Sequence, residues 1–399
     1  MSRDRTGASD IMLLCGTRPE GVKTAPLARL LCLDSRFTVT VVDTGQQPGR
    51  VSEALAPFGL IPNVTLRPQR NTGSLAELAA ALTAGIDQVI GERRPAAVVV
   101  QGDTTTALVG GMVAFWNRVP VVHLEAGLRT GNLDQPFPEE ANRAMIARFA
   151  ALHLAPTDQA RHNLLDEGID PDTVIVTGNT VVDALQLLLR SGAAQPPDWT
   201  DPQRRTVVAT LHRRENWGQG IRDAVAGLAR IAHRCPDIEL VMVAHPNPQL
   251  REHLTDGLRH VPNARITPPL SYPQMIGLLD TASLVITDSG GLQEEAATLG
   301  VPVVVTRDTT ERPEAVQSGL GCLTGTDPRR IEEAAITLLG SPPDNTRASP
   351  FGDGRASQRA ITAISNLLHL APARRIPVPH RSTSPATRSR VAGQTAGTR

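Results

Sequence analysis

Short apolar runs, each about as long as a buried strand, alternate with helical stretches along most of this chain. Nothing else in the sequence limits its possible folds as strongly, because strands that alternate with helices form parallel sheets with right-handed crossovers. We therefore expect an α/β protein with two doubly wound, Rossmann-like domains that face each other across a ligand cleft. The strands are expected at residues 11–16, 38–43, 97–101, 119–124, 152–156 and 174–177 in the first domain, and at 206–211, 239–244, 264–267, 284–287 and 301–306 in the second.

A segment rich in proline and glycine, residues 191–202, separates the two sets of strands and is the predicted linker. The first domain is accordingly placed at residues 1–190 and the second at residues 191–355. The last segment, residues 371–399, is rich in arginine, proline, serine and threonine and contains no acidic residue. This composition is typical of a disordered basic tail with no catalytic part.

Charge and cysteine content narrow the functional class. The 40 basic and 40 acidic residues give a net charge of zero, so neither nucleic acid nor an anionic membrane is the expected partner. The four cysteines are scattered without a C-x-x-C pair, which favours a reduced, cytoplasmic protein without a disulfide framework or a metal site. The first apolar run, residues 11–15, is too short for a signal peptide or a membrane span.

Polar residues gather just after the expected strands, at 16–20, 102–105, 125–130, 211–216 and 245–247. Open α/β sheets bind their ligands at the carboxyl ends of the strands. Because both halves of the chain contribute charged residues to this edge, we predict one site between the two domains.

Two loops in the second half indicate the ligand. Ser289, Gly290 and Gly291 lie between an expected strand and a helix, where free backbone N–H groups and a helix N-terminus form an anion site. A second loop, residues 307–315, follows the next strand and contains two arginines, one of them Arg312, among several carboxylates. Phosphate contacts from the first loop and polar sugar contacts from the second would suit a nucleotide-sugar.

Lys23 is the only lysine among the 40 basic residues. Its retention indicates a place where the planar fork of arginine does not fit. The alternative, that the lysine survives by chance, stays open.

Several side chains at the strand ends are candidates for chemistry. Asp103 either takes part in the reaction or caps the helix that follows it. Glu125 ends a buried strand, where a carboxylate needs a charged or hydrogen-bonding partner, or takes part in the reaction. His123, two residues earlier, is either part of the site or a satisfied core histidine.

Glu139 and Arg143 are spaced to share one face of a helix that begins near residue 138. They form either an ordinary surface pair, worth about 0.3–0.5 kcal/mol, or part of the site. The preceding loop, residues 127–138, is rich in glycine and proline and could close over a substrate. His212, which follows the first strand of the second half, could donate a hydrogen bond to a diphosphate.

With these residues assembled, the chain closely resembles the non-hydrolysing UDP-N-acetylglucosamine 2-epimerases from about residue 11 to residue 368. The motifs that carry the resemblance are GTRPE (16–20), GDTTT (102–106), HLEAGLRTG (123–131), PEEANR (138–143), TGNTVVDAL (177–185), HRREN (212–216), HPN (245–247), TDSGGLQEEA (287–296), RDTTERPEA (307–315) and FGDGRAS (351–357).

The resemblance implies a glycosyltransferase-B-type fold, with a C-terminal helix at residues 356–370 that crosses back to the first domain. It also implies a homodimer that converts UDP-N-acetylglucosamine (UDP-GlcNAc) to UDP-N-acetylmannosamine (UDP-ManNAc) without a cofactor. In this reaction UDP is eliminated to leave a 2-acetamidoglucal and is then added back. A carbon 2 proton with no adjacent carbonyl is too weakly acidic for direct removal by an ordinary carboxylate, which agrees with this order of steps.

Residue roles also follow from the resemblance. Asp103, Glu125 and Glu139 would share the acid and base roles, with Arg143 and His212 beside them. The remaining residues would bind the substrate: Arg18, Lys23, Leu270, Met275, Ser289, Gly290, Gly291, Glu295 and Arg312. Two positions depart from the family pattern. Met275 replaces an aromatic residue against the uracil, and Gln47 replaces a histidine in a segment that binds an activating substrate molecule in some members.

Four other functions remain open. An epimerase of the same mechanism could act on a modified UDP-2-acetamido sugar, and a glycosyltransferase could share the UDP site. A hydrolysing epimerase could release free N-acetylmannosamine and UDP, and a non-catalytic sensor could bind a nucleotide-sugar. The chain has no G-x-G-x-x-G, G-x-x-x-x-G-K-[ST], G-x-S-x-G or H-E-x-x-H motif. These motifs are typical of dinucleotide dehydrogenases, P-loop kinases, serine hydrolases and zincins, in that order, so these four functions lose their main support.

Overall fold

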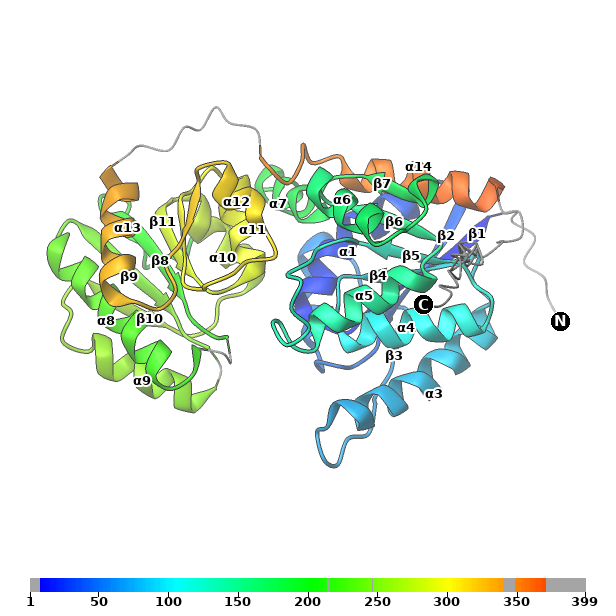
Figure 1. Cartoon of the computed structure of the whole chain (residues 1–399), viewed down its shortest axis with the longest axis horizontal. Helices are drawn as coiled ribbons and strands as arrows, with labels where there is room; N and C mark the ends of the chain where they lie inside the picture. The colour runs from blue at the N-terminus through cyan, green and yellow to red at the C-terminus, as the bar shows by residue number, and fades with distance from the viewer. Residues whose placement is uncertain (1–7, 214–215, 246, 341–348, 371–399) are drawn as a thin grey trace, which may run out of the picture.

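The computed structural model describes residues 8–213, 216–245, 247–340 and 349–370, which form two parallel-sheet domains side by side (Figure 1). The first sheet has seven strands in the order β3-β2-β1-β4-β5-β6-β7. Its strands are β1 (Ser9–Cys15), β2 (Phe37–Asp43), β3 (Val64–Thr65), β4 (Ala97–Gln101), β5 (Val121–Leu124), β6 (Leu152–Ala155) and β7 (Val174–Val176). Its helices are α1 (Arg18–Leu33), α2 (Arg50–Leu55), α3 (Leu75–Arg93), α4 (Thr105–Trp116), α5 (Glu139–Phe149), α6 (Asp158–Asp166) and α7 (Thr180–Arg190), with short 3-10 turns η1 (Ala56–Phe58) and η2 (Pro171–Thr173).

The second sheet has six strands in the order β10-β9-β8-β11-β12-β13. Its strands are β8 (Arg205–Thr210), β9 (Ile238–Val243), β10 (Ala264–Thr267), β11 (Ala282–Thr287), β12 (Val303–Val305) and β13 (Gly321–Leu323). Its helices are α8 (Gln219–Arg234), α9 (Pro248–Leu258), α10 (Tyr272–Asp280), α11 (Gly290–Thr298), α12 (Pro313–Gln317) and α13 (Pro328–Gly340). Strand pairing is parallel in both sheets, so the predicted fold class is confirmed.

The strands are apolar because helices cover both faces of each sheet. Along β1, every residue from Ile11 to Cys15 is fully buried, as expected for a parallel sheet without a solvent face. The strand expected at 301–306 is shorter, since β12 begins only after Pro302, which has no N–H to donate to a ladder.

The two domains share one apolar cluster, which runs from Leu185 and Leu188 of α7 to Ile276 of α10. The linker packs on the same helix, and Gly277 lies so close to the backbone of Gln195 that a Cβ atom would clash there. This packing joins the domains along one side and leaves the carboxyl edges of their strands to form the site.

The last described helix, α14 (Ala356–Leu370), follows the second domain in sequence but packs on α1 and α7 of the first (Figure 1). Asp183 of α7 accepts hydrogen bonds from the first two backbone N–H groups of this helix, those of Ala356 and Ser357, at 3.1 and 2.8 Å. A buried carboxylate therefore fixes where α14 begins. The predicted tail, residues 371–399, lies outside the described residues. Within the described ranges, no helix is long and apolar enough to cross a membrane.

Candidate active site

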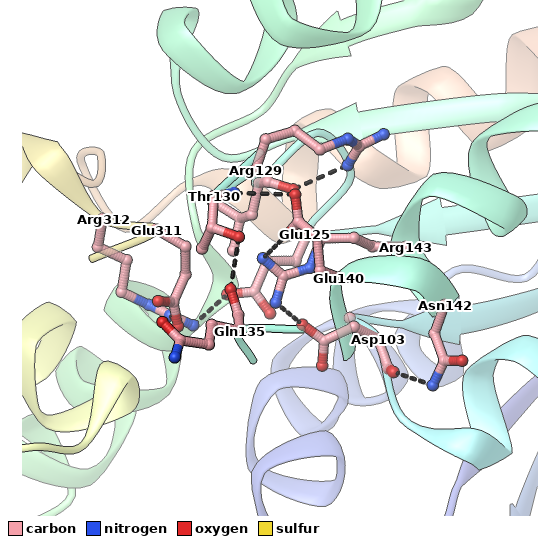
Figure 2. Close-up of polar contacts among 12 residues, drawn as sticks. Asp103, Glu125, Arg129, Thr130, Gln135, Glu140, Asn142, Arg143, Glu311 and Arg312 are labelled. Atoms are coloured by element: carbon pink, nitrogen blue, oxygen red, sulfur yellow. Dashed lines mark hydrogen bonds and ion pairs between the residues drawn. The ribbon is translucent and has the colours of Figure 1, made fainter. Parts of the chain in front are cut away.

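The carboxyl edges of the two sheets bring charged side chains from both domains together. Glu125 follows β5, Asp103 follows β4, and Glu311 and Arg312 lie in the loop between β12 and α12. Figure 2 shows these side chains beside one another, with Arg143 of α5 reaching into the group. The sequence prediction that the two halves contribute to one polar region is confirmed.

Lys23 of α1 contacts two carboxylates. Its Nζ forms a close ion pair with Glu125 and lies 2.8 Å from Oε2 of Glu294, and only 6 % of the lysine side chain is exposed. Burial disfavours the charged ammonium, but Glu125 and Glu294 outweigh burial and raise the pKa of Lys23. The lysine therefore stays charged in the interior because it has two partners.

Glu125 has an unusual backbone conformation, and several charged side chains surround its carboxylate. Its φ of 65° lies in the left-handed region, which a glutamate rarely adopts, and such residues cluster at functional sites. The amides of Gln101 and Asn179 donate to its carboxylate. Burial raises the pKa of Glu125, Glu294 raises it further, and Lys23 and Arg312 only partly compensate.

Glu294 and Arg312 bring the second domain into this cluster. Nε of Arg312 donates to Oε1 of Glu294 at 2.6 Å, and its Nη2 lies 3.7 Å from Oε1 of Glu125. Burial raises the pKa of Glu294, but Arg312 and Lys23 outweigh burial, so the pKa is lowered overall. Lys23, Glu125, Glu294 and Arg312 thus form a ring of alternating charge, which we call the charged quartet.

Asp103 and Arg143 form a second ion pair, in which the arginine is buried and the aspartate is partly exposed. Nη2 of Arg143 donates to Oδ2 of Asp103, and Nη1 lies 3.1 Å from Glu140 (Figure 2). The alternative that Asp103 caps α4 is wrong, because Thr104 is the cap and accepts from the N–H of Ala107 at 3.0 Å. The ordinary surface pair between Glu139 and Arg143 is also wrong, since Arg143 is buried against Asp103 and Glu140.

Glu139 remains beside this pair and is half-buried at the start of α5. Burial raises its pKa, and the charge of Asp103 adds to the rise while Arg213 and Arg143 oppose it. Glu140, which the sequence analysis did not single out, accepts the backbone N–H groups of Thr130 and Gly131, each at 2.9 Å. Glu140 therefore ties the glycine- and proline-rich loop to α5.

His123 is a core histidine. Its Nε2 lies 2.8 Å from the carbonyl oxygen of Gly102, the ring is fully buried, and burial lowers its pKa to about 3. Because the ring stays neutral and contacts the backbone, the structure supports the alternative that His123 is a satisfied core histidine.

On the second domain, Asp288 organises the loop that contains His212. The buried carboxylate accepts the backbone N–H groups of His212 and Arg213, both at 2.9 Å, and lies 3.1 Å from Nδ1 of His212. Burial raises the pKa of Asp288, but its bonds to His212 lower it more, so it is lowered overall. The charged Asp288 thus fixes the orientation of the His212 ring.

Space for a ligand exists at the N-terminus of α11. Gly290 lies against the guanidinium of Arg312, so any Cβ atom there would clash. A Cβ atom at Gly291 would meet no atom within 4 Å. Ser289 precedes the helix without a side-chain cap, so the first N–H groups of α11 keep the donor capacity that an anion requires.

Arg18, Leu270 and Glu295 meet beside this helix. Nη1 of Arg18 donates to the carbonyl of Leu270 at 3.5 Å, and its guanidinium lies 5.7 Å from the ring of Tyr272. Burial raises the pKa of Glu295 to about 7, although Tyr272 and Arg18 oppose the rise. Met275 is buried in α10, one turn after Tyr272. Within the described residues, no group of three or more histidines, cysteines or acids could hold a metal ion.

Comparison with known proteins identifies the family. The family model described as UDP-N-acetylglucosamine 2-epimerase matches residues 31–365. The chain is 40 % identical over 369 residues to the UDP-N-acetylglucosamine 2-epimerase of Escherichia coli (strain K12), and the match covers 89 % of this chain and 98 % of that protein.

Two solved structures are similar. The UDP-GlcNAc 2-epimerase from Neisseria meningitidis bound to UDP-GlcNAc superimposes with a TM-score of 0.85 at 35 % identity, over 90 % of this chain and all of that one (100 %). The Methanocaldococcus jannaschii UDP-GlcNAc 2-epimerase in complex with UDP-GlcNAc and UDP gives 0.80 at 31 %, over 89 % and 99 %. The fold is of the glycosyltransferase-B type, and the chain belongs to the UDP-N-acetylglucosamine 2-epimerase family.

Proposed function

We propose that this protein interconverts UDP-GlcNAc and UDP-ManNAc by inverting carbon 2 of the sugar. The observation that carries the proposal is the position of Asp103, Glu125 and Glu139, which lie at the carboxyl edge of the first sheet. The second domain faces them with an uncapped helix N-terminus at Gly290 and Gly291. Acid and base groups thus lie opposite a site for an anionic leaving group.

The reaction proceeds by elimination and re-addition. The anomeric C1–O bond breaks and its electron pair leaves with UDP, which makes the proton on carbon 2 acidic. A carboxylate removes that proton, and the C2–H electrons form the double bond of a 2-acetamidoglucal. In the return step UDP oxygen bonds to carbon 1 while a proton is delivered to the opposite face of carbon 2.

The leaving diphosphate is stabilised by the second domain and by Arg18. The N–H groups after Ser289 and the His212 ring donate hydrogen bonds to its oxygens, as preorganised donors do at developing anions. Glu295 binds the ribose hydroxyls, and Leu270 and Met275 line the uracil pocket. Arg312, whose guanidinium lies against Gly290, contacts the nucleotide beside the same helix N-terminus.

Proton transfer belongs to the first domain. Glu125 and Glu139 both have pKa values raised by burial, so they can exchange a proton nearer to neutral pH than an exposed glutamate. Arg143 holds the carboxylate of Asp103 in place. Lys23, which the resemblance places among the substrate-binding residues, acts here through its ion pair with Glu125.

The same proposal includes a homodimer formed through α3, α4 and α5. Phe115, Trp116 and Met145 are 47, 61 and 45 % exposed there, in a chain with only 3 % aromatic residues. A groove of about 500 Å³ between α3 and α4 lies beside Trp116. A second copy would cover this apolar face. We place the enzyme in the cytoplasm, because its cysteines Cys15, Cys32, Cys235 and Cys322 are free thiols.

Incubation of the purified protein with UDP-GlcNAc alone, followed by proton NMR, tests the function. We expect the anomeric signal of UDP-ManNAc to grow until a fixed ratio of the two epimers is reached. An Asp103→Asn variant is the matched control and should be slow. Release of free N-acetylmannosamine with UDP, or no change in the spectrum, would contradict the proposal.

A further inference from the structure

Glu294 is the least exposed member of the charged quartet and has no role in the mechanism above. Its side chain is 0 % exposed, and its two oxygens lie 2.8 Å from Nζ of Lys23 and 2.6 Å from Nε of Arg312. An isolated carboxylate at such depth would be very unfavourable, so these two cations are what keep it charged.

The quartet is divided between the domains. Lys23 and Glu125 belong to the first domain, whereas Glu294 lies on α11 and Arg312 directly precedes α12 in the second. If the domains moved apart, each would keep one ion pair, Lys23 with Glu125 and Arg312 with Glu294. Only the contact between Lys23 and Glu294, and the longer one between Arg312 and Glu125, require the domains to be together.

The helix that carries Glu294 also carries the proposed nucleotide contacts. Gly290 and Gly291 are its first residues, and Glu295 is the next residue along the chain. Successive residues of a helix point about 100° apart, so adjacent carboxylates can serve different partners. Glu295 faces Tyr272 and Arg18, and Glu294 faces Lys23. Movement of α11 toward a bound diphosphate would therefore move Glu294 relative to Lys23.

We propose that Glu294 is a positioning residue for the epimerisation proposed above: it reaches across the domain interface to Lys23 and fixes the orientation of the Lys23–Glu125 pair, so this pair reaches its working geometry only when the domains close. Glu294 touches no reacting atom and acts through Lys23. The occupied nucleotide site and the proton-transferring site are thereby coupled through one helix, α11.

Replacement of Glu294 by glutamine should change the pKa of Glu125 in a predictable direction. The amide keeps the size of the side chain and one acceptor for Arg312, but removes the negative charge beside Glu125. The charged groups that act on Glu125 are then Lys23 and Arg312, with the neutral ring of His123 two residues earlier in the chain. The loss of the Glu294 charge lowers the pKa of Glu125.

Steady-state kinetics across pH test the proposal with Glu294→Gln, Glu294→Asp and a control, Glu332→Gln. Glu332 is also a buried carboxylate with two cationic partners, Arg230 and Arg234, but it lies on α13 and belongs to neither the site nor the quartet. In Glu294→Gln we expect kcat to fall by about a hundredfold, the effect of misplacing a reacting group by roughly 1 Å. The limb of the pH profile that reports Glu125 should move to lower pH, and UDP affinity should change by less than about threefold. Glu294→Asp should keep the limb in place, and Glu332→Gln should resemble the wild type.

Three results would overturn the inference: an unchanged kcat, a slower enzyme whose pH limb stays in place, or equal losses in Glu294→Gln and Glu332→Gln. A wild-type protein that binds UDP without epimerising would refute the proposed function instead. Small-angle X-ray scattering still decides the positioning role in that case. With saturating UDP, Glu294→Gln should have a larger radius of gyration than the wild type and Glu332→Gln, and equal radii would remove Glu294 from domain closure.

Discussion

Replacement of Lys23 by arginine separates charge from shape at the centre of the site. The ammonium lies 2.8 Å from Glu294, in close contact with Glu125, and its side chain is 6 % exposed. Arginine keeps the positive charge, so the two carboxylates stay neutralised. What changes is that a longer, planar fork must occupy a position filled by a compact group, beside a second guanidinium from Arg312.

The expected magnitude follows from this lack of space. Overpacking a buried site costs about 1–3 kcal/mol. The free energy of unfolding of Lys23→Arg should therefore be lower than that of the wild type by an amount in this range. Displacement of Glu125 by about 1 Å would slow turnover on the order of a hundredfold. Lys23→Met leaves Glu125 and Glu294 without their shared cation, and the loss of one partner of a buried ion pair costs about 3–5 kcal/mol. The methionine variant should therefore be the less stable of the two, although both should be slow.

Urea unfolding and steady-state kinetics of Lys23→Arg, Lys23→Met and Arg29→Lys provide the measurement. Arg29 lies on the same helix, where its guanidinium donates to the carbonyl of Phe58 at 3.0 Å, away from the quartet. Arg29→Lys should retain wild-type kcat. If Lys23→Arg also turns over at the wild-type rate, the lone lysine is a compositional accident and the reasoning from its geometry is refuted.

Other consequences can be measured separately. Glu139→Gln should lower kcat by at least about a hundredfold with little change in KM, and a kcat within a few fold of wild type would make Glu139 structural. Burial raises the pKa of Glu20 from 4.5 to about 7. Between these two pH values the folded protein keeps a proton on Glu20 that the unfolded chain has released. The free energy of unfolding of the wild type therefore falls as the pH rises from 4.5 to about 7. The unfolding free energy of Glu20→Gln minus that of the wild type should therefore rise by up to about 3 kcal/mol between pH 5 and pH 8 in urea titrations, whereas a pH-independent difference would contradict the role of burial. Trp116→Ser should shift sedimentation from dimer toward monomer, and an unchanged dimer would place the interface elsewhere.

The architecture could be predicted from the sequence because buried parallel strands produce long apolar runs. The runs at 97–101 and 264–267 coincide with β4 and β10. Two short edge strands, β3 at Val64–Thr65 and β13 at Gly321–Leu323, were missed. Unlike the equally short edge strand β7, Val174–Val176, neither is a run of β-branched apolar residues, so no strand signal marks it.

The site could be predicted only in part, for a similar reason. Asp103 and Glu125 follow apolar strands, so their location near a sheet edge could be inferred. Glu294 and Glu140 sit within helices, where a glutamate is ordinary. Glu294 is buried against Lys23 from a distant part of the chain, and Glu140 accepts backbone N–H groups of the preceding loop, at Thr130 and Gly131. Sequence spacing gave Arg143 the wrong partner, because it considers neighbours on one helix and not the loop after β4.

The proposed elimination is tested most directly by following carbon 2 in heavy water. The wild-type protein is incubated with UDP-GlcNAc in deuterated buffer, and both epimers are analysed by NMR and mass spectrometry as equilibrium is approached. We predict that solvent deuterium enters carbon 2 of UDP-GlcNAc and of UDP-ManNAc, since the proton removed to form the glucal exchanges before re-addition. Complete epimerisation with carbon 2 still fully protonated would contradict the mechanism.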